Sequence, residues 1–445
     1  MFIERYAISQ LTSWKDSPSR KPLILLGARQ VGKTALLKHF GKSAFNAVHV
    51  FDFEASPLLA SVFEKDLDTN RIIRELAFHA NQQISIESDL IIFDELQACG
   101  RALTSLKYFC EQQPSLALAC AGSLLGLALP ESSFPVGKVS LLHLSPLTYA
   151  EFLGALGQQH LLKEIAAAFS EDRALSIVAH EKLLDLLKLY LFSGGLPEIV
   201  ATLAPTPELE LPMATKIRDL QTDLLSFYAA DMAKHCGKVN AMHIERLWRA
   251  IPEQLARGLD GSSKKFTFKD AVPGLRSYER LAPPLDWLEK AGLVLKIPLI
   301  EHAEIPLRAY AHETIFKLYS FDVGILGAML QIAPYDLLKE KMGSFKGYLL
   351  ENFVAQELQA KIPNQIFSWR KKESEIEFLI QRYGTPFPIE VKAGHNLRAR
   401  SLKIFRSLYT PESYAILSVN NLEHPNRSPF FFPHYLAHKL TEGEH

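Results

Sequence analysis

The clearest set of chemically competent residues lies between positions 23 and 34. An apolar run, Leu-Ile-Leu-Leu, ends at Gly27, and a GxxxxGKT spacing follows directly. Gly27 and Gly32 let the backbone turn, so that its N–H groups can approach phosphate oxygens. Lys33 supplies a positive charge for the β- and γ-phosphates, and Thr34 supplies a hydroxyl for Mg²⁺. The segment therefore predicts a phosphate-binding loop.

The elements on either side of this loop fit that chemistry. The apolar run before it is typical of a buried strand, and residues 35–40 continue as a helix whose positive N-terminal end attracts an anion. A chance glycine-rich turn is the alternative, which the strand before and the helix after disfavour. The predicted nucleotide contacts are Gly27, Ala28, Arg29, Gln30, Val31, Gly32, Lys33, Thr34 and Ala35.

A pair of carboxylates further along the chain would complete such a site. The apolar run from Leu90 to Phe93 ends in Asp94 and Glu95. Asp94 would hold Mg²⁺, directly or through water, and Glu95 would orient and deprotonate the attacking water. A buried strand with a charged exit is the alternative, but the upstream phosphate loop favours the catalytic interpretation.

A third strand, expected at 116–121, ends in Gly122 and Ser123. A small hydroxyl at this position could sense the γ-phosphate, so Ser123 is a candidate catalytic residue, and a simple turn serine is the alternative. The sequence contains no NKxD-like guanine-reading motif. This favours ATP as the nucleotide.

Composition restricts the class of protein. A chain of 445 residues with 48% hydrophobic and 22% charged content is expected to fold into two to four domains. Lys+Arg and Asp+Glu balance at 49 each, so any nucleic-acid binding has to come from a local patch. The cysteines are scattered without a CxxC pair, which fits a reducing cytoplasm.

Two further features fit a cytoplasmic protein. The N-terminus lacks the apolar h-region of a signal peptide. The longest apolar run, 116–129, is shorter than the roughly 20 residues that cross a bilayer. No membrane partner is expected.

Four pieces of the sequence resemble the AAA-type ATPases that carry a C-terminal domain of unknown function, the DUF4143 group: GARQVGKT, IIFDELQ, AGSLLG and LSPLTYAEFL. The resemblance covers nearly the whole chain and implies Mg²⁺-dependent hydrolysis of ATP. Arg29 matches the family, whereas Ala121 replaces the usual threonine of the sensor segment. Lys138 replaces an arginine and lacks the planar fork that clamps a phosphoryl group.

AAA-type sites often borrow an arginine from a neighbouring subunit, so the resemblance implies a homo-oligomer. Since Lys138 stands at the family's arginine position, other residues have to be considered as arginine fingers. The candidates are Arg101, Arg173 and Arg218.

The middle of the chain has a different pattern. Apolar spacing predicts helices over 147–191, followed by a GGLPE turn that also resembles the family. Residues 240–320 suggest a winged-helix arrangement, with a hairpin-like strand pair at 293–297 and 307–310. The family implies the same arrangement, which serves in DNA binding or in protein contacts.

The C-terminal quarter resembles the PD-(D/E)xK nuclease fold, with a helix at 347–358 and strands at 374–380 and 388–394. Three acids would gather Mg²⁺ with oxygen ligands, and a lysine would activate the attacking water or steady the phosphate. The residues of this predicted nuclease site are Glu351, Glu377, Glu390 and Lys392.

Glu377 departs from the nuclease pattern, in which the strand acid is normally aspartate. A nuclease-like fold kept for binding or structure, and misread strands, are the alternatives. Basic and aromatic residues nearby would suit a DNA or RNA backbone. They are Trp369, Arg370, Lys371, Lys372, Arg398, Arg400, Lys403 and Arg406. The tail, 430–436, is expected to be a packed strand, with an aromatic partner-binding segment as the alternative.

The predicted fold class is α/β: an AAA-type P-loop NTPase with a parallel sheet sandwiched by helices, a helical lid, a winged-helix-like middle and a nuclease-like α/β C-terminal domain. The expected boundaries are 1–150, 151–235, 236–335 and 336–445. The predicted function is ATP hydrolysis that drives or gates the C-terminal domain. An ATP-gated nuclease and a slow nucleotide switch that binds a protein partner are the alternatives.

Overall fold

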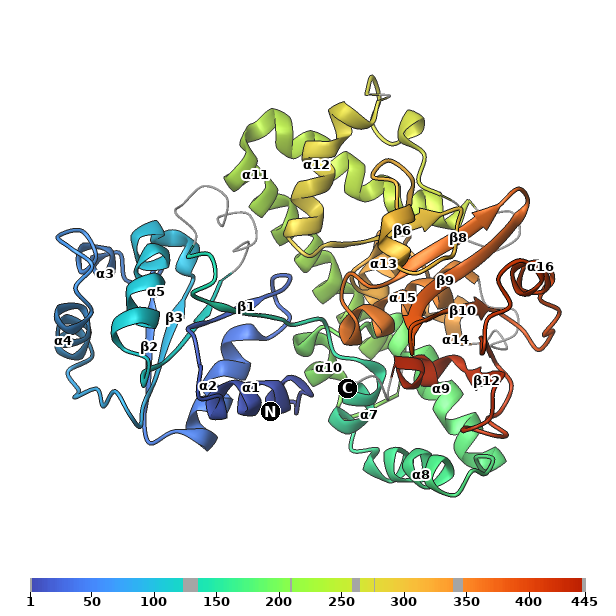
Figure 1. The fold of residues 1–445 in the computed structure, drawn as a ribbon, viewed down its shortest axis with the longest axis horizontal. Coiled ribbons are helices and arrows are strands. Elements are labelled where there is room, and N and C mark those ends of the chain that lie inside the picture. Colours follow the sequence, from blue (N-terminus) through green and yellow to red (C-terminus); the bar gives the residue numbers. More distant parts are fainter. Residues whose placement is uncertain are drawn as a thin grey trace. The chain divides into compact units, whose positions relative to one another are not determined.

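A computed structural model describes residues 2–122, 135–208, 210–257, 265–275, 277–338 and 347–441 (Figure 1). The chain divides into two compact units, Met1–Ser145 with Lys290–Gly292 and Pro146–Glu289 with Leu293–His445. Within the described ranges, no helix combines the length and the apolar character that crossing a bilayer requires.

The first unit is built on a five-stranded sheet with the order β2-β3-β4-β1-β5, and every neighbouring pair is parallel. Apolar runs at 23–26, 47–53, 90–93 and 116–121 each predict a strand, and all four strands are present. The sheet matches the P-loop NTPase fold that the sequence predicts. The fifth strand, β5, was not expected. The strands are β1 (Leu23–Leu26), β2 (Val48–Asp52), β3 (Leu90–Asp94), β4 (Ala117–Ala121) and β5 (Ser140–His143).

Helices cover both faces of this sheet. One face packs with α3, α4 and α5 into an apolar cluster that contains Phe51, Phe93 and Phe109. The other face carries α2, where Gly41 lies against the side chains of Val48 and Leu90. The helical segments are α1 (Ala7–Asp16), α2 (Lys33–Ala44), α3 (Leu58–Ser61), α4 (Thr69–Ala80), η1 (Leu96–Ala98) and α5 (Gly100–Gln112).

The second unit begins with the helices that the apolar spacing predicts over 147–191. Its longest helix, α11, breaks at Gly237, which has non-helical backbone angles. The α-helices are α7 (Tyr149–Ala155), α8 (Gln159–Ser170), α9 (Ile177–Ser193), α10 (Pro197–Leu203), α11 (Leu211–Ala256), α12 (Tyr278–Lys290), α13 (Val323–Met329), α14 (Pro334–Leu338), α15 (Gly347–Lys361) and α16 (Arg400–Tyr409). Short 3₁₀ segments are η2 (Phe268–Asp270), η3 (Leu307–Tyr310) and η5 (His434–Thr441).

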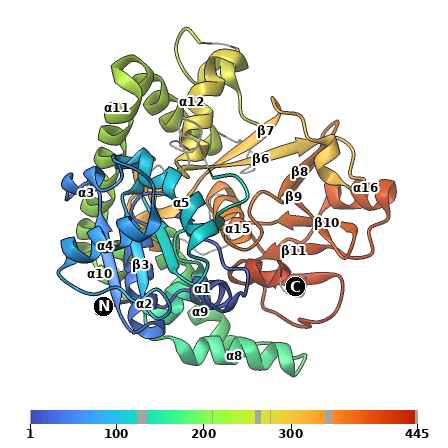
Figure 2. The ribbon, with the colours of Figure 1, turned by 60° about the vertical axis from the view of Figure 1, so that its left-hand side comes forward.

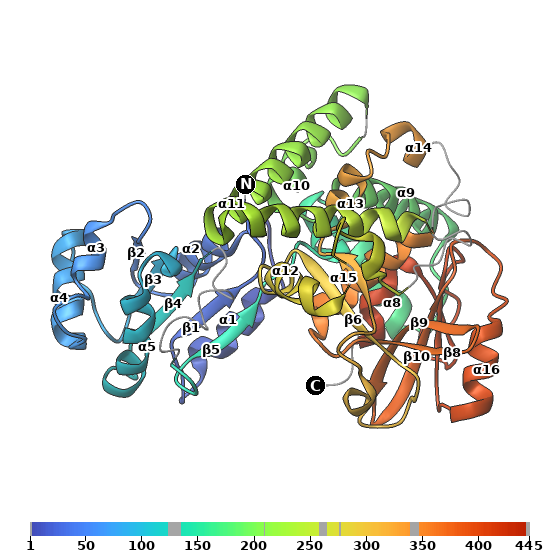
Figure 3. The same ribbon diagram turned by 90° about the horizontal axis from the view of Figure 1, so that it is seen from above.

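A mixed seven-stranded sheet with the order β12-β11-β10-β9-β8-β6-β7 organises the rest of this unit (Figure 2). Helix α16 packs beside β9 (Figure 3). The strands are β6 (Val294–Ile300), β7 (Phe316–Ser320), β8 (Phe367–Lys371), β9 (Ser374–Arg382), β10 (Thr385–Val391), β11 (Ala415–Ser418) and β12 (Phe430–Pro433).

One predicted strand is wrong. Residues 307–310 form the 3₁₀ segment η3, because Pro306 opens a turn in which Ala309 N–H donates to the Pro306 carbonyl. The strand that pairs with β6 is β7, which runs antiparallel to it. Strand β6 also pairs in parallel with β8. The sheet is therefore continuous across the boundary expected at 335/336, and the four-domain division remains a prediction.

The tail is packed against the rest of the second unit, as expected. β12 extends the sheet, and η5 buries Tyr435 and Leu436 fully.

The GGLPE turn is held by a buried carboxylate. Oδ2 of Asp322 accepts the Gly195 N–H at 2.7 Å, and Oδ1 accepts the Ile325 N–H at 3.0 Å, which caps α13. Gly194 ends α9 with φ +73. A Cβ at Gly324 would lie 2.5 Å from the backbone nitrogen of Gly194. The close approach of α13 to the end of α9 therefore requires glycine at 324.

This packing gives a test with a matched control on one helix. Gly324→Ala should destabilise the second unit by about 1–3 kcal/mol, because backbone atoms have to move apart. Gly327, also in α13, has open space where a Cβ would project. Gly327→Ala should be neutral or stabilise by up to about 1 kcal/mol through helix propensity. Thermal unfolding measures both, and equal shifts in Tm would contradict this account.

Candidate functional site

The phosphate loop is closed by backbone conformations that favour glycine. It connects β1 to α2, and Gly27 and Gly32 have φ values of +144 and +92. A Cβ at Gly27 would clash with the carbonyl oxygen of Leu144, the residue after β5. The loop also packs closely against β5's exit, where Leu144 N–H donates to the Leu26 carbonyl at 2.8 Å.

Lys33 lies across this loop. Its Nζ donates hydrogen bonds to the carbonyl oxygens of Gly27 and Ala28 at 2.9 and 2.8 Å. Burial lowers the pKa of Lys33 to about 8, and the charges of Glu95 and Asp94 partly oppose this shift. The Lys33 ammonium group, which would contact a phosphate, therefore begins to lose its proton just above neutral pH.

The two sequence motifs meet at one hydrogen bond. Thr34 Oγ1 donates to Asp94 Oδ1 at 2.9 Å, although the residues are 60 positions apart. Asp94 is the last residue of β3, and burial raises the pKa of its carboxyl group, against the Thr34 hydrogen bond. A hydroxyl and a carboxylate are the hard oxygen donors that Mg²⁺ takes from proteins. These residues fit a magnesium ion.

Glu95 directly follows Asp94 in an unusual conformation. Its φ of +48 is left-handed, which is uncommon outside glycine and concentrates at functional sites. Gln97 Nε2 donates to Glu95 Oε2 at 2.5 Å, so the carboxylate has a fixed neighbour. Ser123 lies outside the described residues, but strand β4, which precedes it, lies between β1 and β3.

Sequence reasoning missed Arg5. Its guanidinium is buried and donates to the Val31 carbonyl at 3.0 Å and to the Ser145 carbonyl at 2.6 Å. Arg5 therefore ties the phosphate loop to the segment after β5. No sequence signal marks it, because a single arginine 26 positions before its partner belongs to no motif.

The proposed finger residues are engaged within the chain. Lys138 pairs with Glu111 at 2.9 Å. Arg101 donates to the Phe63 carbonyl at 2.5 Å. Arg173 pairs with Glu164 and Glu171, and Arg218 donates to Gln221 and to the Ile332 carbonyl.

The acids of the predicted nuclease site come together in the second unit. Glu351, Glu377 and Glu390 are all buried. Burial, followed by the charges of Glu390 and Glu351, raises the pKa of Glu377 well above its usual range. Glu377 Oε2 also accepts the Val391 N–H at 3.2 Å. Residues 376–380 of strand β9 are all buried, so Glu377 does not face solvent.

Two lysines compensate these acids. Lys392 Nζ lies 2.5 Å from Glu390 Oε1. Lys317, in the middle of β7, is completely buried and pairs with Glu375. Burial alone would lower the pKa of Lys317, but Tyr319 and the charges of Glu375, Glu351 and Glu377 raise it well above its usual value.

Sequence reasoning missed Lys317 as well, although a lysine between apolar strand residues was a signal. In the described part of the chain, no group of three or more His, Cys, Asp or Glu side chains is arranged to hold a metal ion. The ammonium groups of Lys317 and Lys392 already balance part of the negative charge of these acids, and a metal ion at this site remains a prediction.

Comparisons with known proteins match three successive segments of the chain to domain models. Residues 19–153 match the model of an AAA domain, and residues 346–428 match that of a domain of unknown function, DUF4143. The chain carries an AAA domain and a DUF4143 domain. Between them, residues 184–336 match another domain of unknown function, DUF8612. The AAA domain has a P-loop ATPase fold, which implies nucleotide binding and is consistent with ATP hydrolysis. No curated protein matches the sequence.

Solved structures give partial similarities. A Walker-type ATPase, PABY2304 of Pyrococcus abyssi, shares 16% identity with a TM-score of 0.44, covering 74% of this chain and 96% of its own. Aeropyrum pernix Orc1 in complex with DNA shares 12% identity with a TM-score of 0.29, covering 75% and 93%. The Thermotoga maritima RuvB branch migration motor shares 13% with a TM-score of 0.30, covering 67% and 91%. Similarities this weak say nothing about what this chain binds.

The lowered pKa of Lys33 predicts a pH dependence of nucleotide binding by the AAA domain. A bound phosphate requires the protonated lysine, and the free protein loses that proton above pH 8. The apparent affinity for ADP should fall about tenfold between pH 7 and pH 9.

Lys33→Arg is the matched control, because a guanidinium stays charged over this range. It should bind ADP more weakly but with a flat pH profile. Titration calorimetry at each pH measures both proteins. A flat profile for the unmodified protein would contradict the assignment of Lys33.

Proposed function

We propose that the AAA domain hydrolyses ATP to ADP and phosphate with Mg²⁺, and that this reaction drives or gates the second unit. The observation that carries the proposal is the 2.9 Å hydrogen bond from Thr34 to Asp94, because it joins the phosphate loop to the acidic strand end. Both residues are then positioned to hold one Mg²⁺, which would neutralise charge on the β- and γ-phosphates.

The loop residues Gly27 to Thr34 bind the phosphates through backbone N–H groups, and the N-terminal end of α2 faces the anion. Lys33 exchanges its carbonyl partners for phosphate oxygens, which restores a fully charged ammonium group. Glu95, held by Gln97, accepts the proton of the attacking water. Ser123 is proposed as the sensor of the γ-phosphate, and an arginine from a neighbouring subunit of a homo-oligomer would complete the site.

Glu95→Gln tests the general base. The variant keeps the size of the side chain but cannot take a proton, so turnover should fall by at least about a hundredfold. Its affinity for ATP should change little, because a general base acts on the attacking water and the loop residues bind the phosphates. Phosphate release and titration with a labelled ATP analogue measure the two quantities. Lys33→Ala is the contrasting variant, which should also lose affinity.

Undiminished turnover in Glu95→Gln would remove that role. Turnover of the unmodified protein slower than about once per minute, together with tight retention of ADP, would instead favour a slow switch that binds a protein partner. Intrinsic switch GTPases hydrolyse their nucleotide as slowly as this.

A nuclease is the second candidate, because burial and the nearby charges of Glu390 and Glu351 raise the pKa of Glu377, which places the three carboxylates close together in the second unit. Lys317 weighs against it, since this ammonium group already supplies positive charge to the same carboxylates. We propose that the network is a buried ion-pair cluster that specifies the fold and does not cleave nucleic acid.

Incubation of plasmid and linear DNA with Mg²⁺ or Mn²⁺, with and without ATP, tests this proposal. No metal-dependent cleavage is expected. The controls are Glu390→Ala and Lys392→Ala, which should behave as the unmodified protein does in this assay. Cleavage that both substitutions abolish would instead establish the ATP-gated nuclease.

A further inference from the structure

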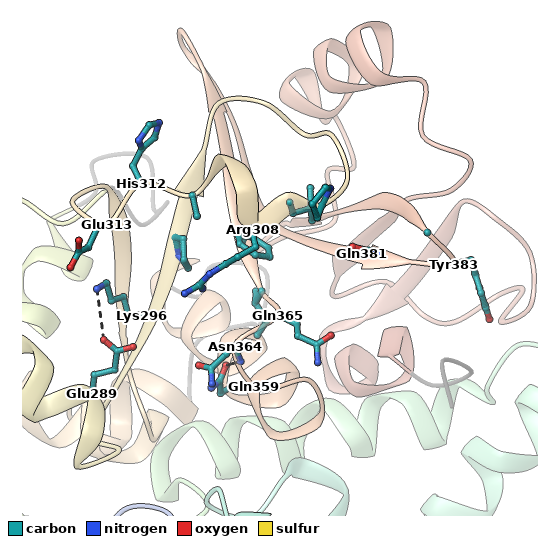
Figure 4. A pocket seen from close by; sticks show the side chains of 17 residues that line it. Glu289, Lys296, Arg308, His312, Glu313, Gln359, Asn364, Gln365, Gln381 and Tyr383 are labelled. Carbon is teal, nitrogen blue, oxygen red and sulfur yellow. Dashed lines mark hydrogen bonds and ion pairs between the residues drawn. The ribbon is translucent and has the colours of Figure 1, made fainter. Parts of the chain in front are cut away.

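A large polar cavity lies in the second unit, away from the residues discussed above. Its volume is about 1310 Å³, and its walls come from β6, η3, the end of α15 and the β9–β10 hairpin (Figure 4). Small-molecule pockets are typically about 300–1,000 Å³. A cavity of this size that opens to solvent suits a segment of a polymer better than a metabolite.

The charged residues of this cavity are separated along it: Glu289, Lys296 and Glu313 lie toward one end, and Arg308 lies in the middle (Figure 4). Glu289 lies 3.8 Å from Lys296, and Glu313 accepts a hydrogen bond from the Tyr278 hydroxyl at 3.0 Å. Both carboxylates are therefore engaged, and they lie with His312 toward one end of the cavity (Figure 4). Arg308 extends from η3 into the middle, and within the described ranges no ion pair or hydrogen bond holds its guanidinium.

Side-chain amides also line this cavity. Asn364 and Gln365 follow the end of α15, and Gln381 comes from β9 (Figure 4). Their side-chain amide groups are exposed to solvent and make no hydrogen bond within the described residues. Each amide offers both donors and an acceptor, which is the pattern that reads the edges of nucleic-acid bases.

An aromatic residue stands at the other end of the cavity from the carboxylates. Tyr383 is 68% exposed at the tip of the β9–β10 hairpin. The guanidinium of Arg382 lies 5.3 Å from the centre of its ring. An exposed ring beside a cation is a platform on which an unpaired base can stack.

We propose that this cavity binds single-stranded nucleic acid. Arg308 holds a phosphate, the amides of Asn364, Gln365 and Gln381 contact base edges, and Tyr383 stacks on a base. The acidic end, with Glu289 and Glu313, repels phosphate, so the strand runs from Arg308 toward Tyr383. This proposal assigns a ligand to the second unit that the proposed function drives or gates. Binding of the strand does not require ATP hydrolysis.

Fluorescence anisotropy with labelled 15-nucleotide single strands of DNA and RNA tests the proposal in the full chain without nucleotide. Arg308→Ala should weaken binding of the preferred strand about tenfold or more, because a charge-assisted contact is lost. The slope of log affinity against log salt should fall by about 0.7. Tyr383→Ala should weaken binding at least about fivefold through lost stacking.

Arg249→Ala is the matched control. This arginine is exposed on α11 and, among the residues that the structure describes, its ion-pair partner is Glu245 one turn away, so its loss should leave binding unchanged. Lys33→Ala should also bind the oligonucleotide normally, even where it abolishes nucleotide binding. Failure of the ATPase proposal is thereby distinguished from failure of this one. Equal Tm values for Arg308→Ala and the unmodified protein exclude misfolding.

Three results would overturn the proposal. The first is no saturable binding of either single strand by the unmodified protein. The second is binding that Arg308→Ala leaves intact and a double change of Arg400 and Lys403 to alanine abolishes, which would place the contact on α16. The third is Arg308-dependent binding of an extended acidic peptide with none of the oligonucleotides, which would make the occupant a polypeptide.

Discussion

The hydrogen bond between the Thr34 hydroxyl and the Asp94 carboxylate depends on the whole of the first unit. Thr34 lies in α2, the helix that follows β1, and Asp94 is the last residue of β3. Strands β1 and β3 are not neighbours, because β4 lies between them. A 2.9 Å contact across that interval requires all the strands to be parallel and to end at one edge of the sheet. Burial of both sheet faces by helices holds the strands in that order.

Two groups of buried carboxylates in this chain have opposite electrostatic situations. Asp94 accepts hydrogen bonds from neutral donors, the Thr34 hydroxyl and the Glu95 N–H. Its negative charge is thus available to the Mg²⁺ of the proposed function. Glu390 is instead contacted by an ammonium group of the same chain, that of Lys392. The chemistry expected of a carboxylate therefore depends on which cation is already beside it, and the motif alone does not say.

Much of the first unit could be predicted from the sequence, because buried parallel strands are apolar runs that end in functional residues. β5 escaped prediction, since its alternating burial at the sheet edge produces no such run. Arg5 and Lys317 escaped for a different reason. Each acts on residues far away in the chain, and only the folded backbone brings those partners within reach.

The second unit was harder to predict because its sheet is assembled from distant segments. The strand assigned to 307–310 had a suitable apolar pattern, but Pro306 initiates a turn there, and β7 takes the place beside β6. The acids of the C-terminal motif lie on α15, β9 and β10, as the sequence predicts, whereas Lys392 follows the end of β10. The balance of their negative charge by Lys317 could not be predicted, because Lys317 lies on β7, a strand that the sequence did not indicate.

The pairing of β6 with β8 has a consequence for how this architecture can be divided. β6 lies in the segment matched by DUF8612 and β8 in that matched by DUF4143, so one ladder of hydrogen bonds joins them. A polypeptide cut between residues 336 and 346 would leave both strands with unpaired backbone edges, which invite aggregation. Recombination that exchanged either segment alone would meet the same penalty. The two segments therefore fold as one unit.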